Sequence, residues 1–205
     1  LQLEAQVYYN YIDHVMDNYS LRLPTGMMAM PMAMNPDRKT VGARFSTLLA
    51  VAETTQLTVG VDTQQNEHSN RMTMNQTAMP YEGMKRVDDA EFEQIGLFAE
   101  VKHFFSDEQR LISGLRYDNW QGKDERALVN LNMMMTASNP TAGKTRHDDL
   151  GSGFIRYEQD LAIGTVYSGI GRSERFPDYW EIIAKESAAT VSAFNIDTEK
   201  TNQLD

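Results

Sequence analysis

Apolar and polar residues alternate with a period of two along most of the chain, whereas a helical spacing of three or four is hard to find. In residues 39–52, for example, Val41, Phe45 and Leu49 fall on one side of an extended chain and Arg44 falls on the other. The same pattern marks residues 5–23, 39–52, 56–68, 93–105, 109–120, 150–157, 161–172 and 202–205. Because this alternation is typical of half-buried strands, we predict an all-β chain.

The connections between these strands alternate between short and long. Short turns are expected at residues 53–55, 106–108 and 158–160, and long polar loops at 24–38, 69–92, 121–149 and 173–200. In an up-and-down sheet, alternate connections lie at opposite ends, so the long loops would all share one end. Outer-membrane barrels have this asymmetry. We therefore predict an antiparallel transmembrane β-barrel, with a soluble β-sandwich or propeller as the alternative.

The composition limits the partners and the chemistry. Nineteen Lys and Arg stand against 29 Asp and Glu, for a formal net charge of −10. We expect no nucleic-acid partner, because phosphate binding needs a basic face, and an acidic chain instead suits cationic ligands. The sequence has no cysteine, which excludes disulfides and thiolate chemistry within these residues. No motif places a Ser/His/Asp set, so we do not expect an enzyme.

Methionine is the unusual component, with 13 residues in the chain. By the loop assignment above, only Met16 lies on a strand, so filling gaps in a core does not readily explain the others. A thioether is a soft, uncharged ligand that selects Cu(I) or Ag(I) over Ca²⁺ and Mg²⁺. The candidate loop ligands are Met27, Met28, Met30, Met32, Met34, Met72, Met74, Met133, Met134 and Met135. The alternative is that these side chains form an apolar plug in the vestibule of the barrel.

His14 and Met16 are candidates for a deeper metal site. At positions i and i+2 of one predicted strand they share a face with Asn10, and the polar character of this face indicates the lumen. Met16 would lie below the loop that carries Met27 to Met34, inside the barrel. The alternative is that Met16 only packs against neighbouring protein. His68, at the top of another strand, could assist in binding Cu(II).

Four segments resemble motifs of the TonB-dependent receptors. Residues 167–181 (YSGIGRSERFPDYWE) resemble the strand and loop that leave the membrane in these proteins, and residues 196–205 (IDTEKTNQLD) resemble the segment that re-enters it. Thr198 stands where proline is usual in the second motif. Residues 96–100 (GLFAE) and 112–118 (ISGLRYD) are similar to strands common in the superfamily.

Within that superfamily, residues 14–19 (HVMDNY), followed by the Met-rich residues 27–38, resemble the copper-receptor branch. The resemblance implies a 22-stranded barrel filled by a plug domain, located in the bacterial outer membrane and surrounded by its lipid. Residues 1–205 would be a portion of that barrel with the plug absent, and TonB would act through the plug. The ligand would be copper, as Cu(I) or Cu(II), with no covalent cofactor. Met16 would be the first choice for a deep ligand, completed by soft ligands from the plug.

Two other functions remain open at this stage. A receptor for an iron chelate or a corrinoid would keep the barrel, but its loops should favour aromatic residues and Arg over Met. A structural barrel that transports nothing would need neither metal nor TonB.

Overall fold

The computed structural model describes residues 1–26, 29–132, 135–183 and 193–205. It is almost entirely β-structure, with one short α-helix and one 3₁₀ turn among the described residues. The elements are β1 (Gln2–Asp13), β2 (Met16–Asp17), β3 (Ala33–Ala52), β4 (Thr55–Thr73), η1 (Tyr81–Gly83), β5 (Val87–Phe104), β6 (Gln109–Asp124), β7 (Leu128–Asn132), β8 (Met135–Ser138), β9 (Thr145–Leu161), β10 (Gly164–Arg175), α1 (Tyr179–Ile183) and β11 (Glu199–Leu204).

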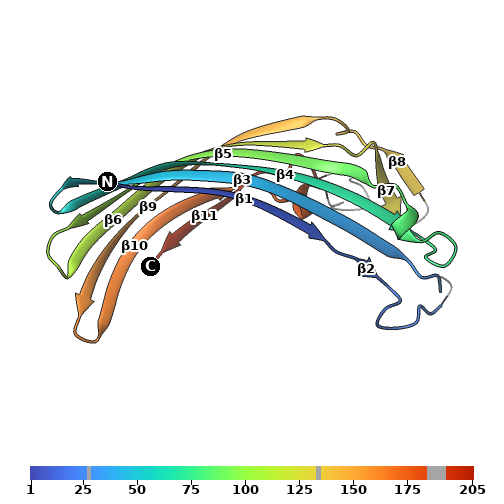
Figure 1. The fold of residues 1–205 in the computed structure, drawn as a ribbon, viewed down its shortest axis with the longest axis horizontal. Coiled ribbons are helices and arrows are strands. Elements are labelled where there is room, and N and C mark those ends of the chain that lie inside the picture. Colours follow the sequence, from blue (N-terminus) through green and yellow to red (C-terminus); the bar gives the residue numbers. More distant parts are fainter. Residues whose placement is uncertain (27–28, 133–134, 184–192) are drawn as a thin grey trace.

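Nine strands form one antiparallel sheet in the order β1-β3-β4-β5-β6-β9-β10-β11, with β2 also paired to β3. The sheet is a curved wall that arches from β1 to β11 (Figure 1). These two strands are its edges and do not pair with each other, so the sheet is not closed. Strands β7 and β8 form a separate hairpin between β6 and β9. The predicted all-β antiparallel fold is therefore confirmed, as an open portion of a barrel.

The connections are sorted by end, as the sequence predicted. The turns that join β3 to β4, β5 to β6 and β9 to β10 lie at the same end as the N-terminus, and the long connections lie at the other end (Figure 1). We call the second end the loop end. The six strands from β3 to β10 in the large sheet each have between 12 and 20 residues. Strands of this length project beyond the roughly 10 residues that cross a bilayer at a tilt.

The outer face of the sheet is apolar and exposed. Val7, Leu97 and Leu115 have exposed fractions of 80%, 57% and 74%. The inner face is polar, and there Arg116 forms ion pairs with Asp62 at 2.8 Å and with Asp118 at 2.5 Å. An apolar exterior around a polar interior is the arrangement of a barrel wall in lipid. Among the described residues, no helix has the length and apolar character needed to cross a membrane.

The main apolar cluster lies against the inner face near the loop end. It forms where residues 176–183 and 193–196, which we call the inner segment, fold back onto β4, β5, β6 and β9. The ring of Phe176 stacks on Trp120 with 5.2 Å between the ring centroids, and Arg146 donates hydrogen bonds to the carbonyls of Phe194 and Ile196. The buried members are Ala90, Phe92, Leu150, Phe176, Tyr179, Ile182 and Phe194. The inner segment is thus fixed to the wall and does not extend into solvent.

Several sequence-based boundaries were wrong. The predicted strand over residues 5–23 is divided into β1 and β2. The predicted turn at 158–160 belongs to β9, which continues to Leu161. Strands β3 and β4 also extend further toward the loop end than expected, so Met34 and Met72 lie on strands, and Met135 lies on β8. In these additional strand residues, polar side chains form hydrogen bonds from one strand to the next. The alternation of apolar and polar residues does not reveal this stabilisation.

Candidate metal-binding site

Three methionines form a row across neighbouring strands at the loop end. Met16 of β2 pairs with Met34 of β3, and Met34 pairs with Met72 of β4. Residues directly opposite each other in antiparallel strands project to the same face with Cα atoms about 5 Å apart. By the alternation along β3, this is the inner face, which Met34 shares with Arg38 and Thr40. Three long thioether side chains therefore start from adjacent positions on the wall of the lumen.

His14 lies two residues before Met16, at the interruption between β1 and β2. Its N–H donates to the carbonyl of Pro36 at 3.3 Å. Proline has no N–H to donate in return, so the regular exchange of ladder hydrogen bonds cannot be completed here. The carbonyl of His14 instead accepts a hydrogen bond from Nδ2 of Asn35 at 2.9 Å. Pro36 thus explains why the chain departs from the ladder just before the Met row.

Asn35 is the centre of a polar network on the outer side of the same strands. It is 1% exposed, and its Nδ2 also donates to Asp13 at 2.5 Å. Its Oδ1 accepts hydrogen bonds from Arg71 at 2.7 Å and from Arg86 at 2.8 Å. The hydrogen bond from Asn35 is the largest cause that lowers the pKa of Asp13, and Arg86 lowers it further. One buried amide therefore connects β1, β3, β4 and the β4–β5 connection.

Asn18 joins Met30 and Met32 by hydrogen bonds to the chain that follows Met16. Its backbone N–H donates to the carbonyl of Met32 at 3.3 Å, and its Oδ1 accepts from the N–H of Met32 at 2.8 Å. Its Nδ2 donates to the carbonyl of Met30 at 3.2 Å. On the other side, the N–H of Gln76 donates to Pro31 at 2.7 Å. The segment with Met30 and Met32 is therefore held between the chain after Met16 and the chain after β4.

A cavity of about 190 Å³ lies beside His14, between the wall and the inner segment. His14 and His68 line it from the wall, and Asp178, Tyr179 and Trp180 line it from the inner segment. The ring of His68 stacks on that of Tyr179, and the hydroxyl of Tyr179 donates to Asp89 at 2.5 Å. The inner segment therefore forms one side of the space next to His14.

Burial controls the ionisation around this cavity. Burial is the largest cause that lowers the pKa of His68, and together with the nearby positive charge of Arg38 it brings the pKa to about 4, so the ring is neutral at neutral pH. Burial raises the pKa of Asp89, against the hydrogen bond from Tyr179, which acts to lower it. His68 is only 8% exposed, and its ring packs against the aromatic rings of Tyr179 and Phe92. Its ring is engaged in packing, which limits its access to a metal ion.

The structure brings some of the predicted ligands together and leaves others apart. Met16, Met34 and Met72 share the row, and His14, Met30, Met32 and Met74 lie on the chain segments next to it. Met135 lies on β8, in the separate hairpin. Met27, Met28, Met133 and Met134 lie outside the described residues.

The described residues contain no group of three or more His, Asp or Glu side chains that could hold a metal ion. The soft donors that the register places together are the thioethers of Met16, Met34 and Met72, with His14 on the adjacent segment. A set of such donors would suit soft ions and not Ca²⁺ or Mg²⁺. Sequence reasoning overlooked Asn18 and Asn35, which position these donors. Pro36 within an extended segment was the available signal, because a strand proline requires another donor nearby.

The comparisons with known proteins agree with this architecture. Residues 1–205 match the family described as "TonB dependent receptor-like, beta-barrel". A solved structure described as "Copper transporter OprC" is 42% identical in sequence with a TM-score of 0.88, and the match covers 98% of this chain and 32% of that one. No curated protein matches the chain. The chain thus spans about a third of that transporter's length, and it belongs to the TonB-dependent receptors, as a portion of their β-barrel in the bacterial outer membrane.

Proposed function

We propose that this chain is the part of an outer-membrane copper receptor that first receives the ion, and that its loop-end thioethers bind Cu(I) and direct it inward past Met16 and His14. The Met16–Met34–Met72 row carries the proposal. It provides three soft donors side by side on the inner face, in a position that an ion entering from outside the cell would reach. Copper is the metal named for the similar transporter, and the thioether donor set suits the same ion.

The family adds the route and the energy source to the proposal. A TonB-dependent receptor is driven through its plug, so the ion would pass from these residues to ligands on the plug. His14 and Met16, on the inner face, would take part in that transfer. Copper is the cargo in this scheme, and no reaction is catalysed.

The test is titration of the full-length receptor with Ag(I), a redox-stable analogue of Cu(I), followed by native mass spectrometry and calorimetry. Met34 is the middle member of the row, so Met34→Leu removes the donor that both neighbours share while conserving the volume of the side chain. We expect Met34→Leu to lower the Ag(I) affinity about tenfold, which corresponds to roughly 1.4 kcal/mol, or to remove one bound ion.

Met84→Leu is the matched control. Met84 lies in the β4–β5 connection after η1, is 38% exposed and is not one of the paired Met16, Met34 and Met72 positions, so its loss should leave the affinity unchanged. Equal affinity and stoichiometry in the Met34→Leu variant and the unmodified receptor would reject the row as a binding site. Uptake of an iron chelate or corrinoid, with no Ag(I) binding at all, would show that one of those compounds is the ligand and that copper is not.

A further inference from the structure

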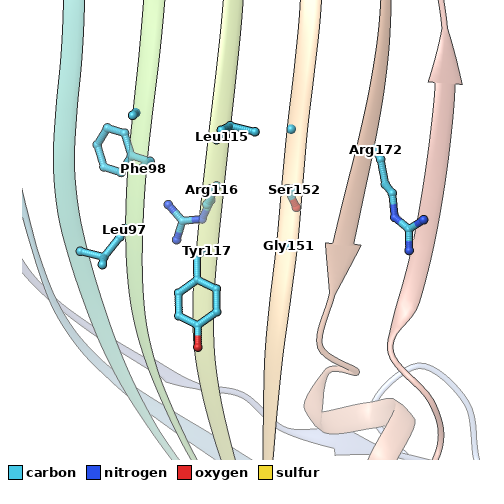
Figure 2. Close-up of a pocket in the computed structure, with 10 residues that line it drawn as sticks. Leu97, Phe98, Leu115, Arg116, Tyr117, Gly151, Ser152 and Arg172 are labelled. Atoms are coloured by element: carbon cyan, nitrogen blue, oxygen red, sulfur yellow. The ribbon is translucent and has the colours of Figure 1, made fainter.

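A hollow of about 640 Å³ lies on the sheet away from the metal site, between β5, β6, β9 and β10 (Figure 2). Most of its lining residues belong to the outer face. The register places Ala99, Leu115 and Gly153 in one row and Leu97, Tyr117 and Gly151 in the next. The floor forms where β9 contributes two glycines, so that Leu115 and Tyr117 on one side have no side chain opposite them. The sequence therefore creates a groove in an otherwise continuous apolar surface.

The groove lies near the outer-leaflet border of the apolar band. Gly153 of β9 and Arg172 of β10 are paired, and each is eight residues from the turn that joins the two strands. Eight strand residues at the usual tilt rise roughly 20 Å, against an apolar band about 25 Å tall. Beyond this level the outer face of β9 becomes polar at Asp149, which accepts hydrogen bonds from Tyr117 and Asn119. The groove therefore opens at the level of lipid headgroups.

The rim of the groove carries both cations and carboxylates. Arg172 lines the groove, is 53% exposed at its side chain and donates to Glu174 at 2.7 Å. Lys200 lies 3.8 Å from the same carboxylate. Two cations thus share Glu174, which leaves positive charge for a phosphate. The carboxylates of Glu174 and Asp149 offer acceptors that match the hydroxyl groups of a sugar.

We propose that this groove binds an acyl chain of a phosphorylated glycolipid of the outer leaflet, a lipopolysaccharide, with a phosphate at Arg172 and Lys200 and sugar hydroxyls at Glu174 and Asp149. The apolar floor accounts for the chain, and the mixed rim accounts for the headgroup. A glycerophospholipid could use the floor and the cations, but it offers fewer hydroxyl donors for the carboxylates. The proposal rests on the membrane location and is independent of the metal site.

Two substitutions test the apolar floor and the charged rim of the groove separately. A Cβ added at Gly151 meets no atom within 4 Å, so Gly151→Leu places a larger side chain on the apolar floor of the groove. Arg172→Gln removes the cation and keeps a side chain of similar length. Ala43→Leu is the control, because it adds bulk to the outer face of β3, away from the groove. The β-sheet circular dichroism of each variant, measured in parallel, verifies that the receptor is folded.

The experiment uses the full-length receptor purified from outer membranes, washed extensively in mild detergent and analysed for retained lipid by native mass spectrometry. We expect glycolipid on the unmodified receptor and on Ala43→Leu, and about tenfold less on Gly151→Leu and Arg172→Gln, since one charged contact or a few buried methylenes account for such a change. Equal retention in all four proteins would overturn the site. Retention of glycerophospholipid in place of glycolipid would overturn the proposed occupant, and normal retention by Gly151→Leu would overturn the groove.

Discussion

The imidazole of His68 lies parallel to the phenol ring of Tyr179, with 4.1 Å between the centroids and 6° between the planes. His68 belongs to β4 and Tyr179 to α1, so this stack joins the barrel wall to the inner segment. The hydroxyl of Tyr179 continues the connection to Asp89 on β5. These contacts position the inner segment beside the cavity next to His14, and they can be tested separately from metal binding.

Tyr179→Phe should loosen the inner segment while keeping the ring stack. The substitution removes the hydroxyl that donates to Asp89 at 2.5 Å, and Oδ1 of Asp89 already lacks a partner among the described residues. A buried acceptor that loses its donor costs about 1–3 kcal/mol. We therefore expect hydrogen exchange of residues 176–183 to accelerate by about tenfold or more in the full-length receptor.

Tyr157→Phe is the matched control for this prediction. It makes the same chemical change on the outer face of β9, where the hydroxyl of Tyr157 has only a 3.4 Å contact with Gln159. Exchange of residues 176–183 should then remain at the unmodified rate. Similar rates in Tyr179→Phe and Tyr157→Phe would show that the hydroxyl of Tyr179 does not hold the inner segment.

The attachment of the inner segment should weaken as the pH falls from about 6.5 toward 4. The pKa of buried His68 is lowered to about 4, whereas a solvated histidine binds its proton near 6.5. Within this window His68 binds a proton when the inner segment detaches and exposes it, but not while it is buried, so detachment becomes easier as the pH falls. Below about pH 4 His68 is protonated in both states, and the free energy of attachment falls no further. The full contribution is present above pH 6.5 and is on the order of 2 kcal/mol after allowance for partial exposure.

The raised pKa of Asp89 acts in the opposite direction, because protonation in place favours the closed state as the pH falls. His68→Phe keeps the stack with Tyr179 and removes the titration of His68. Exchange of residues 176–183 between pH 7 and pH 5, corrected for the intrinsic rate, should therefore lose its acid-induced acceleration in this variant. The same acceleration in both proteins would exclude His68 as its origin.

The fold could be predicted from the sequence because it depends on a simple alternation. Lipid selects apolar residues on one face of every strand, so the period of two and the sorting of short and long connections appear directly in the sequence. The strand ends were harder to predict, because beyond the bilayer the outer face becomes polar. There Asn35 and Arg71 stand in place of apolar residues and bond to each other, and the strands continue without the pattern that identified them.

The site was predictable in composition and not in arrangement. Soft donors could be recognised from Met16 and the Met-rich segments, but the row depends on the register between β2, β3 and β4, which the sequence does not specify. The role of Asn35 depends on contacts between residues 21 to 51 positions apart. Such long-range hydrogen bonds leave no local signal, and they are what hold His14 and Met34 in place.

Asn35→Asp should disturb His14 without removing any metal ligand. The carboxylate can still accept from Arg71 and Arg86, but it cannot donate to Asp13 or to the carbonyl of His14, and it adds repulsion with Asp13. Two lost donations and a new like-charge pair should destabilise this end of the sheet by about 2–4 kcal/mol. Hydrogen exchange of residues 13–16 should accelerate and Ag(I) affinity should fall.

Gln65→Glu makes the same change from amide to carboxylate at an exposed pair, where Gln65 donates to Glu91 at 2.9 Å. Its effect should stay within about 0.5 kcal/mol, because exposed charges are screened. An Asn35→Asp variant as stable as Gln65→Glu, with normal exchange at residues 13–16, would contradict the role of Asn35.

Asn18→Ala should weaken the contribution of Met30 and Met32 to ion binding. The Asn18 side chain accepts from Met32 and donates to Met30, so its removal leaves one backbone hydrogen bond between these segments. Two net hydrogen bonds of about 1 kcal/mol each correspond to roughly a 30-fold loss of ordering, and the Ag(I) affinity should fall by up to that factor. Ser20→Ala removes a bond to Asp17 in the same connection and contacts neither methionine, so its affinity should be unchanged. If both variants bind Ag(I) normally while Met34→Leu does not, the ion is held by the Met row alone and the segment before β3 serves only to cover it.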